Sequence, residues 1–101
     1  MMPNKQCMKD VLEFISENTT VEVDDILYHN IILSTLNIST LLDKMSKEGK
    51  YTIEEIAYNF LQCYYNGLIN ADIKYQQKMI QSATSNIIGI TFAGIDFINQ
   101  N

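Results

Sequence analysis

Apolar residues recur at helical spacing from the start of the chain. Between Asn4 and Glu17, six apolar side chains fall on one stripe of a helix, namely Cys7, Met8, Val11, Leu12, Phe14 and Ile15. Asn4 is a residue type that caps helix N-termini, and the run Asn18-Thr19-Thr20 breaks the stripe. The pattern therefore predicts a first helix between these two signals.

Residues 21–38 carry two conflicting patterns. Val21-Glu22-Val23 alternates as a strand does, and the β-branched pair Ile31-Ile32 is compatible with a strand. Asp24 and Asp25 are instead typical of the first turn of a helix, where acidic groups meet the positive end of the helix dipole. We favour a helix over this segment.

A helix-turn-helix follows. Ser39 can cap a short helix that ends at Gly49, and Thr52 with Glu55 forms the T-x-x-E capping box that starts the next helix. Asn66-Gly67 closes that helix, because both residues tolerate the left-handed conformation. The apolar positions are Leu41, Leu42 and Met45 in the short helix, and Ile53, Ile56, Ala57, Phe60, Leu61 and Tyr64 in the longer one.

Two strands and a last helix complete the chain. Residues 71–75 alternate as a strand, and residues 87–90 are a second apolar strand after a polar connection. A hairpin directly after a helix-turn-helix is a wing. Thr91 can then cap a short C-terminal helix. The predicted fold is a mostly α (α+β) winged helix, with a two-stranded wing and a short terminal helix, as one domain over residues 1–101.

The composition is that of a cytoplasmic globular domain. The chain has 101 residues, of which 47% are hydrophobic and 19% charged, and a chain of this length usually forms one domain. Two cysteines are too few for a disulfide framework. No stretch is long and apolar enough to cross a bilayer, and the first residues lack a secretory signal, so we expect no membrane association.

The charge is acidic and unevenly distributed. Twelve Asp and Glu residues stand against seven basic ones, all lysine, for a formal net charge of -5. Residues 1–38 hold six of the acidic residues and only two of the lysines, so the first third of the chain is the most acidic. No run of basic residues marks a nucleic-acid-binding patch.

Three separated segments stand out, namely MKDVLEFISE at residues 8–17, EEIAYNFLQCYYNGLI at residues 54–69 and ITFAGIDFI at residues 90–98. In this order, they resemble a family of small winged-helix proteins of unknown function from bacteria and their phages. Asn59 and Ile95 replace two histidines that are frequent in that family. The resemblance implies a winged-helix fold and a phage or mobile-element setting, but no activity.

The chemistry of the side chains gives no sign of an enzyme. His29 is the single histidine, and its spacing from Cys7 and Cys63 matches no known Cys–His catalytic motif. We interpret both cysteines as ordinary buried residues. Asp25 and His29 lie four residues apart and could share a helix face as metal ligands. Zinc needs three or four ligands, and no further pair is visible in the sequence. Phosphate-binding glycine loops and nucleophile motifs are absent. We therefore expect no catalytic residues, metal, cofactor or small-molecule substrate.

Binding to DNA is the alternative function, as in many proteins with a helix-turn-helix. The second helix of such a motif lies in the major groove, but here residues 52–65 contain no Lys or Arg. Affinity for a duplex would rest on Lys47, Lys50, Lys74 and Lys78, near the turn and the wing. The charge disfavours nucleic acid, although a sequence-specific DNA-binding regulator stays open.

Binding to another protein is the function that we favour. Tyr58, Asn59, Gln62 and Tyr65 can form one outward strip of the longer helix, and tyrosine is enriched at interfaces. An acidic face would suit a basic partner, such as a host nucleic-acid-binding complex that the protein blocks. The partner can also be a second copy, for instance through the apolar terminal helix. The tyrosines could equally pack against the wing.

Overall fold

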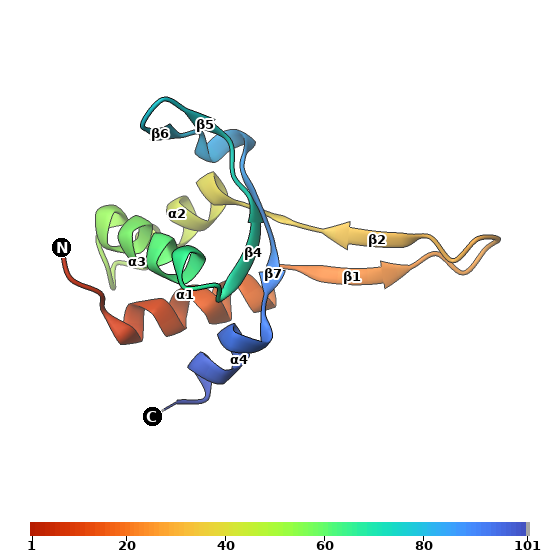
Figure 1. Ribbon diagram of the computed structural model, residues 1–101, viewed down its shortest axis with the longest axis horizontal. Coiled ribbons are helices and arrows are strands. Elements are labelled where there is room, and N and C mark those ends of the chain that lie inside the picture. The colour runs from red at the N-terminus through yellow and green to blue at the C-terminus, as the bar shows by residue number, and fades with distance from the viewer. Residues whose placement is uncertain (101) are drawn as a thin grey trace.

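Four α-helices and several short antiparallel strands make up residues 1–100, the part of the chain that this computed structural model describes (Figure 1). The elements are α1 (Lys5–Glu17), β1 (Thr20–Val23), β2 (Ile31–Ser34), β3 (Leu36–Asn37), α2 (Ile38–Lys47), α3 (Ile53–Tyr65), β4 (Ile69–Asp72), β5 (Tyr75–Gln76), β6 (Met79–Ile80), the 3-10 turn η1 (Ser82–Thr84), β7 (Asn86–Ile90) and α4 (Phe92–Ile98). The α+β class predicted from the sequence is confirmed.

The first helix lies where the apolar stripe predicts it. The Asn4 side chain accepts a hydrogen bond of 3.1 Å from the backbone N–H of Cys7, which caps α1 as expected. The buried side of α1 packs against α3 and β7. Its buried residues are Cys7, Met8, Val11, Leu12 and Ile15.

The capping box of α3 is confirmed, and the predicted cap of α2 is wrong. Glu55 N donates to the Thr52 hydroxyl at 3.1 Å, while Thr52 N donates to the Glu55 carboxylate at 3.0 Å. Ser39, however, lies inside α2, because that helix begins at Ile38. Ile38 N donates to Ser85 O at 3.0 Å, so a long-range contact satisfies the start of α2 in place of a local cap.

A three-stranded antiparallel sheet with the order β3-β7-β4 closes the core. The predicted strand at residues 87–90 is confirmed as β7. The predicted strand at residues 71–75 is only partly right, because β4 ends at Asp72 and Tyr75 starts the separate β5–β6 hairpin. Between the end of β4 and the start of β5, Lys74 N donates to the Ser85 hydroxyl at 2.9 Å.

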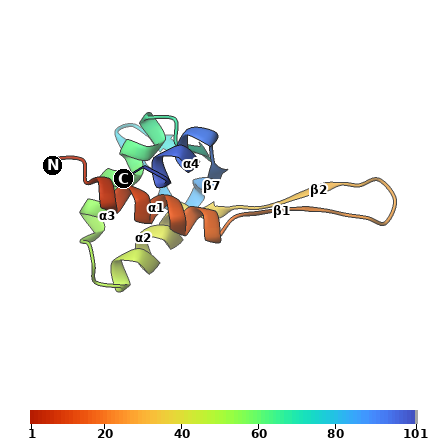
Figure 2. The same ribbon diagram turned by 90° about the horizontal axis from the view of Figure 1, so that it is seen from below.

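The helix that we favoured for residues 21–38 is wrong. β1 and β2 form an antiparallel hairpin, hereafter the arm (residues 20–34), which projects from the body of the molecule (Figures 1 and 2). Asp24 begins the turn instead of a helix: its side chain accepts from Ile26 N at 2.9 Å, and its N–H donates to Asn30 O at 2.8 Å. His29 completes the turn with a positive φ of 51°.

The C-terminal helix depends on a close approach of two backbones. The Thr91 hydroxyl accepts from Gly94 N at 3.1 Å, as the predicted cap requires, and donates to Gly67 O at 2.7 Å. A Cβ on Gly94 would lie 2.3 Å from Leu68 O. Only glycine therefore fits at this contact between α4 and the end of α3.

Candidate binding surfaces

The outward face of α3 carries three of the four residues predicted for protein binding. Tyr58 and Gln62 are half-buried, and Tyr65 is 64% exposed. Asn59 is a correction, because only 2% of it is exposed and it cannot contact a partner. Its side chain accepts from Asn4 N at 2.8 Å and donates to Glu55 O at 2.8 Å. Asn59 thus holds the N-terminal segment against α3.

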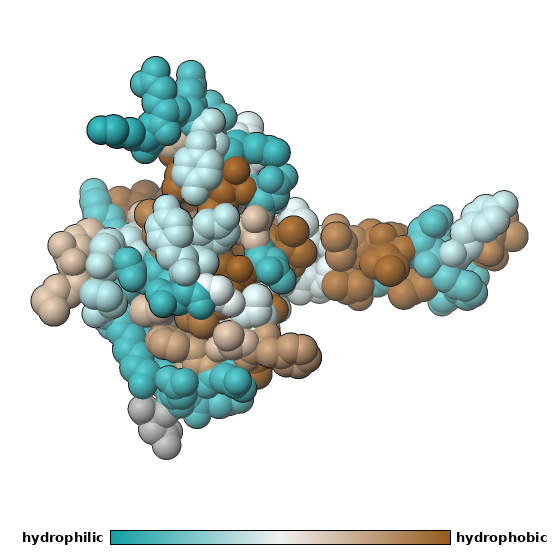
Figure 3. Space-filling view, viewed as in Figure 1, coloured by the Kyte–Doolittle hydropathy of each residue, from teal (hydrophilic) through white to brown (hydrophobic). Residues whose placement is uncertain are grey.

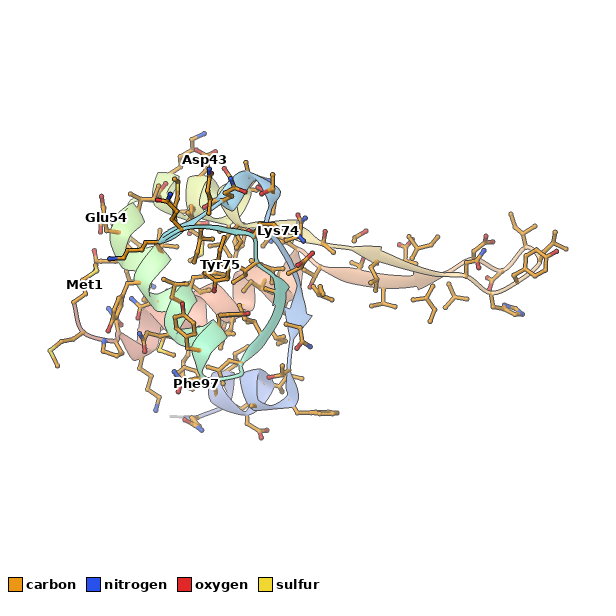
Figure 4. All side chains as sticks on the ribbon, turned by 45° about the horizontal axis from the view of Figure 1, so that its top comes forward. Met1, Asp43, Glu54, Lys74, Tyr75 and Phe97 are labelled. Carbon is orange, nitrogen blue, oxygen red and sulfur yellow. The ribbon has the colours of Figure 1, made fainter. Side chains whose placement is uncertain are left out.

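Three tyrosines gather at the C-terminal end of α3. The rings of Tyr64 and Tyr65 meet edge to face, with 5.5 Å between their centroids. The β5–β6 hairpin brings Tyr75 to the same place, and a hydrogen bond with the Tyr65 side chain raises the pKa of Tyr75. Figure 4 shows Tyr75 near α3, with Glu54 at the other end of that helix. Tyr65 and Tyr75 touch, yet both stay more than half exposed.

Tyr51 belongs to the scaffold and not to this cluster. Its hydroxyl donates to Asp10 Oδ2 at 2.6 Å, which links the turn before α3 to α1. Burial and this hydrogen bond raise the pKa of Tyr51. Partial burial pushes the pKa of Asp10 upward, but hydrogen bonds from Tyr51, Lys50 and Gln6 outweigh it and leave that pKa below its ordinary value.

Acidic side chains surround a cleft between α1 and the C-terminal end of α2. The cleft has a volume of about 260 Å³, and its charged lining consists of Asp10, Glu13, Glu17, Glu48 and Lys50. Four carboxylates against one ammonium make this region negative. Three of these carboxylates, Asp10, Glu13 and Glu17, come from the acidic first third of the chain, and the cleft would repel a polyanion.

Three of the four lysines considered for DNA binding have a carboxylate of the same chain beside them. Lys47 lies 3.1 Å from Asp43, Lys50 lies 3.0 Å from Asp10, and Lys74 lies 3.3 Å from Asp72. Lys78 is exposed in the turn that joins β5 to β6. Three of the four ammonium groups therefore lie within ion-pair distance of a carboxylate, although all three lysines stay more than half exposed.

The two cysteines lie in the core, whereas the single histidine lies in the turn of the arm. Cys7 and Cys63 are fully buried, and burial raises the pKa of Cys7 to about 11 and that of Cys63 to about 12. His29 lies in the turn of the arm, where its Nδ1 is 4.0 Å from the exposed carboxylate of Asp25. Among the described residues, no group of three or more His, Cys, Asp or Glu side chains could hold a metal ion.

The arm is the surface that the sequence analysis missed. Large aliphatic residues on both strands are at least 49% exposed, and Figure 3 shows apolar residues along the arm. These residues are Val21, Val23, Ile31, Ile32 and Leu33. The alternation of Val21-Glu22-Val23 and the β-branched pair Ile31-Ile32 were the signals that could have identified it.

No helix within residues 1–100 combines the length and the apolar character that a bilayer crossing requires. The comparisons with known proteins give no relative: no family model and no curated protein matches this sequence, and no solved structure matches this fold.

Proposed function

We propose that this protein is a winged-helix recognition module that binds another protein and catalyses no reaction. The order of elements supports the winged-helix assignment. A helix-turn-helix, α2 and α3, is followed by β4 and β7 with the β5–β6 hairpin between them, and then by the short α4. β7 lies between β4 and β3, so the wing strands continue into the core sheet.

The pairing of the lysines is the observation that favours protein over DNA. A duplex is bound largely through phosphate neutralisation, which needs cations that are free to replace counterions. Lys47, Lys50 and Lys74 each lie within 3.3 Å of a carboxylate. Glu54 adds a further negative charge at the N-terminal turn of α3, the part of a recognition helix that reads bases.

The tyrosine surface on α3 and β5 is the proposed contact site. Tyr65 and Tyr75 are both more than half exposed, and tyrosine combines a large apolar area with a polar hydroxyl, as interface anchors do. Next to them, Leu61, Ala57 and Ile80 line an apolar groove of about 140 Å³, which α2, α3 and β6 enclose together. The acidic cleft favours a partner with a basic surface. The phosphate-binding groove of a host nucleic-acid-binding complex has that chemistry.

Affinity capture with matched variants tests this function. The wild-type chain is immobilised and exposed to a lysate of the cells in which its gene resides. We expect Tyr65→Ala and Tyr75→Ala to lose the captured protein by at least about tenfold, as for interface anchors. Phe92→Ala is the control, because Phe92 is 88% exposed but lies on α4. Equal capture by all four chains would contradict the proposal.

A further inference from the structure

The arm presents one face that is wholly aliphatic. In the register of β1 and β2, Val21 lies opposite Leu33 and Val23 lies opposite Ile31. Directly opposed residues of an antiparallel pair point to the same side, so these four side chains share one face. Glu22, Ile32, Thr20 and Ser34 lie on the other face. Between 52% and 70% of each residue on the aliphatic face is exposed.

This exposure is unusual for a hairpin of two strands. Such a hairpin is marginally stable in water unless a third strand or another surface covers its apolar side. Figure 2 shows the arm extending away from the helices. The turn of the arm adds three more exposed apolar residues, Ile26 (84%), Leu27 (76%) and Tyr28 (79%).

We propose that the aliphatic face of the arm is a homodimer interface, covered by the same face of the arm of a second copy, with the two arms antiparallel. This inference goes beyond the proposed function, since it concerns a surface distinct from the tyrosine surface of α3.

The exposed area agrees with the requirement of a dimer. The aliphatic face and the turn of one arm expose apolar side chains of on the order of 900 Å², and each partner of a standard interface buries about 800 Å². Two identical twisted strand pairs also present matching surfaces, so a two-fold axis between them gives a closed dimer.

The charges also favour a second copy. The chain carries a net charge of -5, so most contacts between two copies are repulsive. The aliphatic face has no charged side chain, because Glu22 points to the opposite side. Two acidic copies can therefore meet on this face without pairing like charges, while Asp24 and Asp25 lie outside it, in the turn of the arm.

The base of the arm offers a place for the partner's turn. A groove of about 240 Å³ lies between the arm and β7, lined by Val21, Ile88 and Ile90 among others. In an antiparallel arrangement, the turn of one arm reaches the base of the other. Ile26, Leu27 and Tyr28 of the second copy would then pack in or beside this groove.

The oligomeric state tests the proposal. Sedimentation equilibrium of the full chain should give twice the 11.6 kDa mass of one chain. Leu33→Lys should weaken the dimer at least about 100-fold, because it buries a charge in an apolar interface. Ile32→Lys, on the opposite face of the same strand, is the matched control and should stay dimeric. A Leu33→Lys chain that remains fully dimeric would overturn the proposal.

A monomeric Leu33→Lys chain could have lost the interface or the fold of the arm, and cysteine cross-linking distinguishes these two causes. The native thiols are buried, so oxidation reports on an introduced cysteine. Ile31→Cys should form a disulfide-linked dimer, and Ile32→Cys should not. The reverse result would contradict the proposed face. A monomeric wild-type chain would overturn the dimer, and binding of that monomer to phosphatidylcholine vesicles would assign the face to a membrane surface instead.

Discussion

The buried side chain of Asn59 in α3 hydrogen-bonds to the backbone of Asn4, the residue that caps α1. Asn59 Oδ1 accepts from Asn4 N at 2.8 Å, across 55 positions of the sequence. Asn4 in turn caps α1 through Cys7 N. One amide side chain therefore fixes where the first helix begins relative to the helix that carries the tyrosine surface.

Loss of this hydrogen bond should destabilise the fold. Asn59→Ala leaves the Asn4 N–H without its acceptor and opens a small cavity, at a cost of about 1–3 kcal/mol in the free energy of unfolding. Urea unfolding followed by circular dichroism measures this change. Gln62→Ala, one turn further along α3 and half-buried, should change the free energy by less than about 0.5 kcal/mol. Equal effects of the two substitutions would contradict the role of Asn59.

The hydrogen bond between Tyr51 and Asp10 should make the free energy of unfolding fall both at low pH and at high pH. The pKa of Asp10 lies below its ordinary value of 3.8, so its stabilisation is present above that value and is lost as the pH falls through the folded-state pKa. The pKa of Tyr51 is raised above 10.0, so its stabilisation is present below that value and is lost as the pH rises through the folded-state pKa.

Tyr51→Phe tests this linkage. The substitution removes the hydroxyl that donates to Asp10 and should lower the stability near pH 7 by about 1–2 kcal/mol. It should also reduce the loss of stability between about pH 5 and about pH 3, because the pKa of Asp10 returns toward its ordinary value. Unfolding free energies of both chains across this range provide the measurement. Parallel pH curves would show that the hydrogen bond has no such effect.

Gly94→Ala should destabilise the folded protein far more than Gly89→Ala does. The new Cβ at position 94 would lie 2.3 Å from Leu68 O, and the backbone must move to relieve the clash. We expect a loss of about 1–3 kcal/mol. At position 89 the nearest atom is Thr19 Oγ1 at 3.9 Å, an ordinary contact. Thermal unfolding of both variants distinguishes them, and equal midpoints would contradict the close approach of α4 to Leu68.

The two thiols should react slowly while the protein is folded. Burial raises the pKa of Cys7 from 9.0 to about 11, which lowers its thiolate fraction about 100-fold, before access is considered. Reaction with a chromogenic disulfide near pH 8 should therefore be at least about 100-fold slower in the native chain than in urea. Rapid labelling of the native protein would contradict this burial and reopen a chemical role for the cysteines.

Local signals explain which elements could be predicted from the sequence. The cap at Asn4, the Thr52–Glu55 box and the Asn66-Gly67 terminus each act within a few residues, so α1 and the ends of α3 were found. Aspartate is common both in the first turn of a helix and in tight turns, so the local sequence around Asp24 fits either structure. Only the pairing of β1 with β2 shows that Asp24 lies in a turn.

Long-range contacts explain the errors at the candidate site. Asn59 is a polar residue whose partner lies 55 positions away, so helical periodicity alone placed it on the outward face. Ser39 does not cap α2, because the backbone N–H of Ile38 at the start of that helix donates to Ser85 O, at the far end of the β4–β7 connection. The contact between Tyr65 and Tyr75 likewise depends on where the β5–β6 hairpin folds, which no local pattern specifies.

Titration of a labelled DNA duplex decides between protein binding and DNA binding as the function of this fold. At about 50 mM salt, where phosphate contacts are strongest, we expect no binding beyond a weak background, because three of the four lysines are paired with carboxylates. An Asp43→Asn, Asp72→Asn chain, which frees two lysines, should bind more tightly than the wild type. Saturable binding of the wild-type chain at 50 mM salt that falls steeply by about 200 mM would contradict the account and establish the DNA-binding alternative.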